Sequence, residues 1–382
     1  MLLAACAAAQ PGDGRMTPVA TTAPAPTMAA TPTVVATLPS PSPTPVPTAA
    51  ATASPNVAAA SPTITLGSPN PAGGGGMLPY LDDRSGPEQL LRSYVSALDR
   101  KEYLRAYSYW QPEAAAAQLP PFEELARGYA DTASVRLVLG QIGGDAGAGQ
   151  LYYAAPVELV ARGTDGGQRG FVGCYRLHLS RPELQAAPPF RPLAIEGAAV
   201  QSLPTGADAA VLLARACPEA SQRPPAIGQT PSDPAAIGPD RYLDDRSTPE
   251  QVLRSYYNAV NRKEYARAYS YIEPSATGSF PQFAELARGY ADTASVQLRI
   301  GAVVTGAAAG NLYFTAPVAL LARSADGAAH AFAGCYTLHL GQPSVQATPP
   351  FQPMGIRAAT IQPVAGQAEA EELIKRPCPA PS

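Results

Sequence analysis

Residues 1–79 lack aromatic side chains altogether and carry only two charged residues, Asp13 and Arg15, yet they contain 15 of the chain's 43 prolines. A segment with so few large apolar side chains cannot bury a core, so we expect residues 7–79 to form a disordered linker rich in Pro, Thr and Ala. The other 303 residues carry every aromatic side chain and are long enough for two ordinary domains.

The chain also lacks a run of basic residues and any Cys and His residues at the spacing of zinc ligands. No stretch after the amino terminus approaches the roughly 18 apolar residues of a transmembrane helix. With a net charge of −3, the chain is a poor candidate for binding nucleic acid, and we expect no metal site. The motifs G-x-S-x-G and G-x-G-x-x-G are missing as well, so no cofactor is predicted.

The amino terminus reads Leu-Ala-Ala-Cys at residues 3–6. This tetrad resembles a bacterial lipobox, which implies lipidation of Cys6 and a truncated signal at residues 1–6. A complete secretory signal needs a basic region and an apolar run, and only five residues precede Cys6. Either the coding sequence begins upstream, or the match is coincidental and residues 7–79 are an untethered leader. In the first case the linker is a spacer of at most about 200 Å between membrane and domains.

The chain beyond residue 79 contains two similar copies of one sequence. The hexapeptide Tyr-Leu-Asp-Asp-Arg-Ser occurs at 80–85 and again at 242–247, and residues 80–109 share 23 of 30 positions with their counterparts. Copies of this length match whole domains and exceed solenoid repeats. The domains predicted in this way are residues 80–217 (the first repeat) and 242–378 (the second repeat), with a Pro-, Gly- and Ala-rich linker at 218–241.

The secondary structure has to suit both repeats. A Ser-x-x-Glu capping box with proline in the first turn, at 85–88 and again at 247–250, predicts the start of a first helix. The further elements expected in the first repeat are helices near 103–110 and 122–130, strands at 135–139, 151–162, 170–180 and 193–203, a glycine-rich turn at 143–149 and a final helix at 207–216. Three helices followed by four strands is an α+β order, in which helices cover one face of a curved antiparallel sheet.

Residues 97–103, with the motif Arg-Ala-Tyr-Ser-Tyr at 105–109 and the repeat of both at 259–271, resemble the NTF2-like (cystatin-like cone) superfamily. The resemblance implies two tandem α+β domains, each with three helices on a curved four-stranded antiparallel sheet and a short carboxyl-terminal helix. That superfamily includes enzymes, ligand binders and structural modules, so the resemblance assigns no activity.

Four cysteines, two in each repeat, stand 43 residues apart within their repeat. Four cysteines allow three pairings, and duplication favours bridges within each repeat because each copy should fold alone. The disulfides predicted are Cys174–Cys217 and Cys335–Cys378. Paired cysteines indicate an oxidising compartment, which agrees with export, whereas four free thiols in a cytosolic protein are the alternative.

The alternation of side chains in the third strand separates its two faces. Tyr175 and Leu177 share the face expected under the helices, whereas Cys174 and His178 share the opposite face. The second copy repeats this pattern with His339. We therefore interpret both histidines as partly covered polar residues near a disulfide and not as catalytic groups.

The expected inner face carries no carboxylate, which leaves tyrosines as its polar side chains. A tyrosine with a pKa of about 10 is a poor general base at neutral pH, so we predict no catalytic residue. The candidates for lining a ligand cavity are Tyr94, Tyr107, Tyr153, Tyr175, Tyr256, Tyr269 and Tyr336.

The motif Asp-Asp-Arg precedes the first helix of each repeat, at 82–84 and 244–246. Two adjacent carboxylates beside an arginine supply too few oxygen atoms for calcium. We expect these charges to pair locally.

These features predict a non-enzymatic extracytoplasmic binding or scaffolding module on a flexible stalk, held at the membrane only by a lipid anchor. Its partner is a small apolar or aromatic ligand in the cavities, or an envelope protein if the cavities are filled by their own side chains. An enzyme that uses the cavity tyrosines on a small molecule is the remaining alternative.

Overall fold

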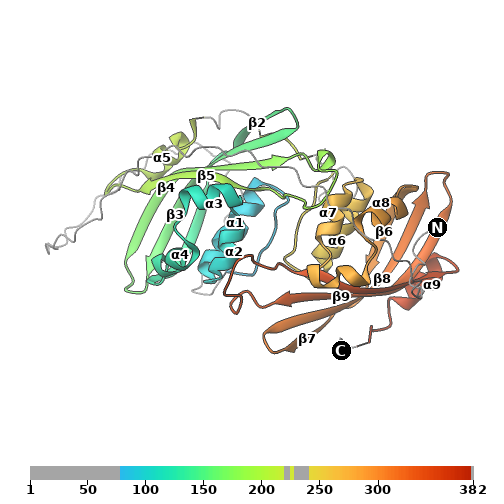
Figure 1. Cartoon of the computed structure of the whole chain (residues 1–382). Helices are drawn as coiled ribbons and strands as arrows, with labels where there is room; N and C mark the ends of the chain where they lie inside the picture. Colours follow the sequence, from blue (N-terminus) through green and yellow to red (C-terminus); the bar gives the residue numbers. More distant parts are fainter. Residues whose placement is uncertain (1–77, 219–223, 228–240, 380–382) are drawn as a thin grey trace, which may run out of the picture. The chain divides into compact units, whose positions relative to one another are not determined.

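The computed structural model describes residues 78–218, 224–227 and 241–379. Cys6 with the predicted signal, the linker up to residue 77 and most of the linker between the repeats lie outside the described residues. Each repeat contains helices and one five-stranded antiparallel sheet (Figure 1), which confirms the α+β class. No helix of the described part is long and apolar enough to cross a membrane.

The described elements of the two repeats follow the same order, except that the 3₁₀ helix η1 occurs in the first repeat alone and one helix differs in type. Those of the first repeat are α1 (Pro87–Asp99), α2 (Tyr103–Ser108), α3 (Pro112–Gln118), α4 (Phe122–Gly128), β1 (Thr132–Leu139), β2 (Gly143–Gly147), β3 (Gln150–Gly163), β4 (Gln168–Ser180), η1 (Pro182–Leu184), β5 (Ala194–Ser202) and α5 (Ala209–Arg215). Those of the second are α6 (Pro249–Asn261), α7 (Tyr265–Ser270), η3 (Pro274–Ser279), α8 (Phe283–Gly289), β6 (Thr293–Ile300), β7 (Val304–Ala308), β8 (Asn311–Ser324), β9 (Ala329–Gly341), β10 (Gly355–Val364) and α9 (Gln367–Leu373). The helix that differs in type is α3, whose counterpart is the 3₁₀ helix η3.

Two details of the expected domain are wrong. The glycine-rich stretch predicted as a turn forms strand β2, because pairing with the first half of the long β3 satisfies its backbone. The sheet therefore has five strands, with the order β1-β3-β4-β5 and β2 beside β3. Helix α3 was also missed. It begins at Pro112, and its counterpart lies where the second repeat has lost one residue.

The central strand of each sheet contains a proline at the point where that strand changes its neighbour. Pro156 stands between the part of β3 that pairs with β1 and the part that pairs with β2. Its carbonyl accepts a hydrogen bond from the Gly140 N–H at 2.8 Å, so a backbone N–H at this position would face the gap between β1 and β2. Proline therefore costs no ladder hydrogen bond here. Pro317 and Gly301 repeat the arrangement in the second repeat, also at 2.8 Å.

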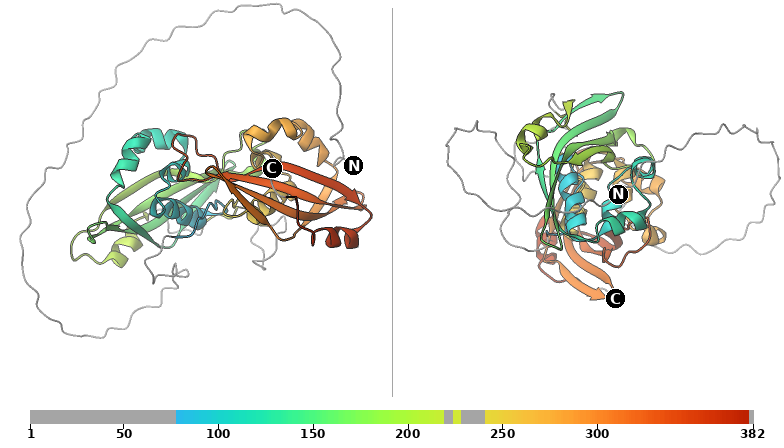
Figure 2. Two further views of the ribbon diagram at one scale, coloured as in Figure 1. Left: turned by 90° about the horizontal axis from the view of Figure 1, so that it is seen from below. Right: turned by 90° about the vertical axis from the view of Figure 1, so that its left-hand side faces the viewer.

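The helices that precede each sheet cover one face of it, and the carboxyl-terminal helix lies on the other face (Figures 1 and 2). In the second repeat, Ala370 of α9 packs on Ala319 and Ala333 of the outer face. Both predicted disulfides are present and tie the end of this helix to the sheet. Their Cα atoms are 5.1 Å apart for Cys174–Cys217 and 5.9 Å apart for Cys335–Cys378.

Residues assigned to the linkers contribute to the first repeat. The Leu78 N–H donates to the Asp99 carboxylate at 2.9 Å, and Leu78 packs on the core. Ile227, from the described part of the linker between the repeats, packs on the same core. The ordered part of the first repeat is therefore larger than residues 80–217.

A fully buried arginine lies at the centre of each helical layer. In the first repeat, Arg105 is paired with the Glu102 carboxylate at 2.6 Å and donates to the Leu81 carbonyl. Its guanidinium carbon lies 4.5 Å from the centre of the Tyr80 ring. Arg105 thereby joins α2 to the segment that precedes α1, and we call residues 80–85 and 242–247 the lead segments.

The second repeat has the same arrangement. Arg267 is paired with Glu264 at 2.6 Å, donates to the Leu243 carbonyl and lies 4.6 Å from the Tyr242 ring centre. The identity of the Glu-Tyr-x-Arg motif in both copies was the only sequence signal for this buried pair.

We predict that Arg105→Met lowers the free energy of unfolding by up to about 3–5 kcal/mol, because the buried Glu102 carboxylate then keeps only the partly exposed Arg100, and the Leu81 carbonyl only the Tyr109 hydroxyl. Arg181→Met is the matched control, because Arg181 pairs with Glu183 at the surface, where such pairs contribute under about 1 kcal/mol. Urea denaturation of the full chain followed by circular dichroism measures both. Equal losses in the two variants would contradict the central role of Arg105.

Candidate functional site

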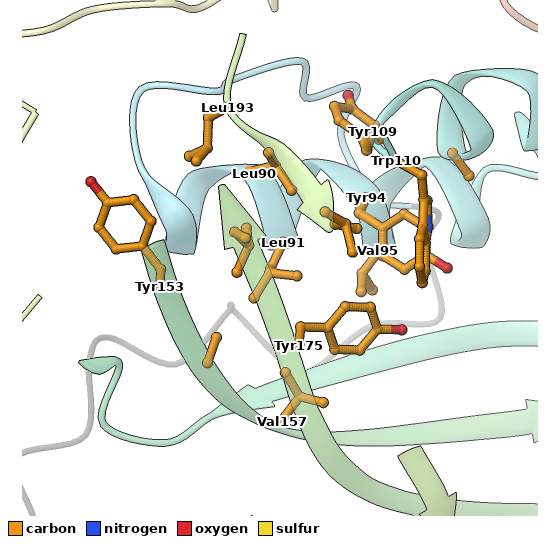
Figure 3. Packing of buried hydrophobic residues seen from close by; sticks show 14 of the residues in the cluster. Leu90, Leu91, Tyr94, Val95, Tyr109, Trp110, Tyr153, Val157, Tyr175 and Leu193 are labelled. Atoms are coloured by element: carbon orange, nitrogen blue, oxygen red, sulfur yellow. The ribbon is translucent and has the colours of Figure 1, made fainter. Parts of the chain in front are cut away.

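The inner face of the first sheet is buried under α1, as the strand alternation predicted. Tyr153 and Val157 of β3 and Tyr175 and Leu177 of β4 all belong to the core (Figure 3). Cys174 and His178 of β4 alternate with these residues and point to the outer face. The inner faces are therefore the place to look for the predicted ligand cavities.

Aromatic side chains fill the space between α1 and the first sheet. The ring centres of Tyr94 and Tyr175 are 5.9 Å apart, and Trp110 lies 6.5 Å from Tyr94 and 6.2 Å from Tyr175. Figure 3 shows the three rings side by side. The structure thus brings together two of the predicted cavity tyrosines, in contact with each other and with the tryptophan.

The second repeat fills the same space with more tyrosines. The hydroxyls of Tyr257 and Tyr336 are hydrogen-bonded at 2.7 Å, and the Tyr256 hydroxyl lies 3.4 Å from that of Tyr290. A hollow of about 40 Å³ remains between Tyr257, Tyr290 and Phe332. That volume suits a water molecule and not an organic ligand.

Three predicted cavity residues lie apart from these clusters. Tyr107 packs against Phe122 of α4, with ring centres 6.1 Å apart, and Tyr269 packs against Phe283 of α8 at 5.8 Å. The Tyr153 hydroxyl donates to a carbonyl of the described linker segment, that of Pro225, at 3.0 Å.

The electrostatics of the inner faces disfavour proton abstraction. Burial raises the pKa of Tyr94, Tyr175, Tyr256 and Tyr336 above the ordinary tyrosine value. A tyrosine held neutral in this way can donate a hydrogen bond but cannot take a proton from a substrate at neutral pH.

The two outer-face histidines have partners at both ring nitrogens. His178 lies 2.7 Å from the Gln111 amide nitrogen and 2.7 Å from the Gln150 amide oxygen, and burial lowers its pKa. These partners suit a neutral ring protonated at Nε2. His339 instead lies 2.5 Å from the Glu273 carboxylate and 2.8 Å from the Asn311 amide oxygen. Both histidines act as polar links between elements.

The Asp-Asp-Arg motifs do not pair locally as predicted, because the two lead segments form an antiparallel bridge with each other. Asp83 faces Asp245 in this bridge. The Arg84 N–H donates to the Asp244 carbonyl at 2.7 Å, and the equivalent bond from Arg246 to the first lead segment has the same length. Identical sequences suit an antiparallel bridge, because each N–H donor of one segment meets the equivalent carbonyl acceptor of the other.

The serines expected to begin the first helices belong to this bridge. The Ser247 hydroxyl accepts from the Asp82 N–H, and the Ser85 hydroxyl accepts from the Asp244 N–H, both at 2.8 Å. The predicted capping boxes are therefore wrong, because the hydroxyls are used across the bridge. Gly86 precedes α1 without a side-chain cap, whereas the Thr248 hydroxyl caps α6.

Carboxylates lie close together at this bridge. Burial, reinforced by the charge of Asp245, raises the pKa of Asp83 to about 7, and burial also raises the pKa of Asp245. Within residues 78–218, 224–227 and 241–379, no group of three or more His, Cys, Asp or Glu side chains is arranged to hold a metal ion. The bridge is thus a proton-sensitive contact in which a carboxyl group is neutral below about pH 7.

The second repeat has a groove of about 600 Å³ on the outer face of its sheet, beside the Cys335–Cys378 disulfide. Strands β8, β9 and β10 form its floor, and the chain after α9 borders it. The polar side chains that line it are Tyr313, Thr315, Thr337, Arg357, Thr360, Gln362 and Arg376. Thr315 is 2% exposed, and its hydroxyl has no hydrogen-bond partner among the described residues.

The first repeat differs at the equivalent positions. Ala154 replaces Thr315 and packs with Cys217, and Glu196 replaces Arg357. Sequence reasoning missed the groove because it looked for what the copies share. The signal was present in their outward-facing differences.

No family model, curated protein or solved structure matches the chain. The NTF2-like assignment accordingly stays a proposal, and the functional argument rests on the side chains described above.

We predict that pairing of the lead segments weakens with rising pH. A carboxyl group whose pKa is higher in the paired state than in the free chain binds its proton more tightly when paired, so pairing is strongest below about pH 4 and declines until about pH 7. The protection factors of the Arg84 and Arg246 amides, measured by hydrogen exchange, should fall on the order of tenfold to a hundredfold from pH 5 to pH 8.

Asp83→Asn should remove most of this dependence, because the amide is neutral at both pH values. Asp145→Asn, at an exposed site of β2, is the control and should retain it. Equal protection at pH 5 and pH 8 in the parent chain would contradict the raised pKa.

Proposed function

We propose that the chain is a pair of NTF2-like domains that serves as a non-enzymatic binding or scaffolding module outside the cytoplasm. In this proposal Cys6 carries the lipid anchor and residues 7–79 act as the stalk. The two disulfides support a location outside the reducing cytoplasm, where such bonds persist.

The observation that carries the proposal is the contrast between the two faces of each sheet. The inner faces are occupied by the protein's own aromatic rings, which contact and hydrogen-bond one another. Enzymes need a titratable group beside a space that admits substrate, and the tyrosines here are buried and held neutral. Binding at an outer surface agrees better with these features than turnover inside the sheet.

Docking of another envelope protein is the second candidate. The filled inner faces favour it, because a scaffold needs a rigid core and presents its outer surfaces to the partner. A folded protein partner and a small ligand differ in mass by orders of magnitude, so one measurement separates them.

Native mass spectrometry of the full chain, purified from the exported fraction of its host, tests the proposal. We expect an added mass at fixed stoichiometry, either of a small molecule or of a protein, that disappears on denaturation. Material that carries neither at any protein concentration would contradict a binding role.

Paired phenylalanine variants locate the bound species. Tyr175→Phe with Tyr336→Phe removes two inner hydroxyls and should leave the added mass unchanged, because these groups already bond within the core. Loss of the bound species from a variant with an unchanged circular dichroism spectrum would place the site on the inner faces instead.

A further inference from the structure

We propose that the outer groove of the second repeat binds a small organic carboxylate with a flat apolar body, one molecule per chain. This inference rests on the proposed binding function and names the site and the ligand chemistry. The evidence is the buried hydroxyl of Thr315, the two arginines that line the groove and the small residues of its floor.

The buried hydroxyl of Thr315 lies on the floor of the groove, and no residue in the part of the chain that the structure describes forms a hydrogen bond with it. Thr315 stands directly opposite Thr337 in the β8–β9 ladder, so both side chains are on the same face of the sheet. A buried hydroxyl left without a hydrogen bond destabilises the fold, and native proteins rarely keep one. A ligand oxygen in the groove would satisfy it after a small rotation of the Thr315 side chain, because the hydroxyl is almost wholly covered.

The charges of the groove favour an anion. Both charged residues that line it, Arg357 and Arg376, are arginines. The Arg357 guanidinium lies 3.3 Å from the Glu273 carboxylate and 5.7 Å from the centre of the Tyr313 ring, and these contacts hold it at one end of the groove. Guanidinium groups bind carboxylates through paired hydrogen bonds, which makes a carboxylate the expected anion.

The remainder of the groove suits an apolar body. Along the floor, Ala333 and Ala358 have small side chains and Gly334 has none, and the side chains of Tyr313 and Leu373 border it. The volume of about 600 Å³ lies within the range of small-molecule sites. Small floor residues beside an aromatic ring leave room for a planar group.

The first repeat provides a natural control within the same chain. Ala154 has no hydroxyl to satisfy, and Glu196 would repel a carboxylate where Arg357 attracts one. Arg215 nevertheless matches Arg376, and Arg176 takes the place of Thr337. Because Ala154 packs on Cys217 and Glu196 offsets the charge of one of these arginines, binding should be confined to the second repeat, with a stoichiometry of one.

The test uses 4-fluorobenzoate as the probe and the full chain, observed by fluorine NMR. The fluorine resonance of 4-fluorobenzoate should broaden on addition of the chain, and its titration should saturate at one site per chain. 4-Fluorobenzyl alcohol and 4-fluorobenzylamine, which have the same ring, should bind at least about tenfold more weakly, since they lack the charge that the arginines recognise. Equal binding of the three probes would overturn the proposal.

Three substitutions assign the site. Arg376→Gln is at the surface and should fold normally while weakening carboxylate binding about tenfold, and Arg357→Gln and Thr315→Val should weaken it by a similar factor. Arg215→Gln, the matched change in the first repeat, should have no effect. An equal loss in Arg215→Gln and Arg376→Gln, or no loss in either, would overturn the assignment.

The outcome separates this inference from the proposed function. If native mass spectrometry shows a bound species while 4-fluorobenzoate fails to bind, the groove assignment falls and the binding role stands. If the chain carries no bound species and binds no probe, both fall.

Discussion

The buried pair of arginine and glutamate in each helical layer is the contact on which the other features depend. Arg105 and Arg267 each neutralise a buried carboxylate and hold a carbonyl of the lead segment at the same time. A guanidinium with five donors can satisfy both partners without water, which an ammonium group could not do in the same geometry. Once the lead segment is held to α2, its Asp and Ser groups are presented for pairing with the other copy.

Duplication has left the inner faces alike and the outer faces different. Both repeats close their interior with tyrosines, although the first uses Trp110 where the second relies on hydroxyl contacts such as Tyr257 to Tyr336. Interiors are close-packed, so a change on one side demands a matching change elsewhere. Outer-face positions beside the groove are less constrained, although Ala154 and Thr315 are themselves buried. The Ala154 to Thr315 and Glu196 to Arg357 differences therefore mark the surface on which the second repeat diverged.

Periodicity and spacing predicted the features that depend on local geometry. The two faces of β4, the bridges at Cys174 and Cys335, and the positions of the long strands follow from side-chain alternation and from the demand that both copies fold alike. Strand β2 could not be predicted, because its glycines carry no pattern and its stability comes from pairing with β3. The helix caps were misread because Ser85 and Ser247 suit a local and a distant hydrogen bond equally well.

The sequence by itself determined that the folded part is a duplication, that each copy is cross-linked, and that the inner face offers tyrosine and no carboxylate. Only the tertiary structure decided that those tyrosines contact one another, that the lead segments pair across the copies, and that Thr315 is buried beside an arginine-lined groove. The physical reason is that residue order specifies which way a side chain points. Which atoms it meets depends on strand register and on the volumes of distant side chains.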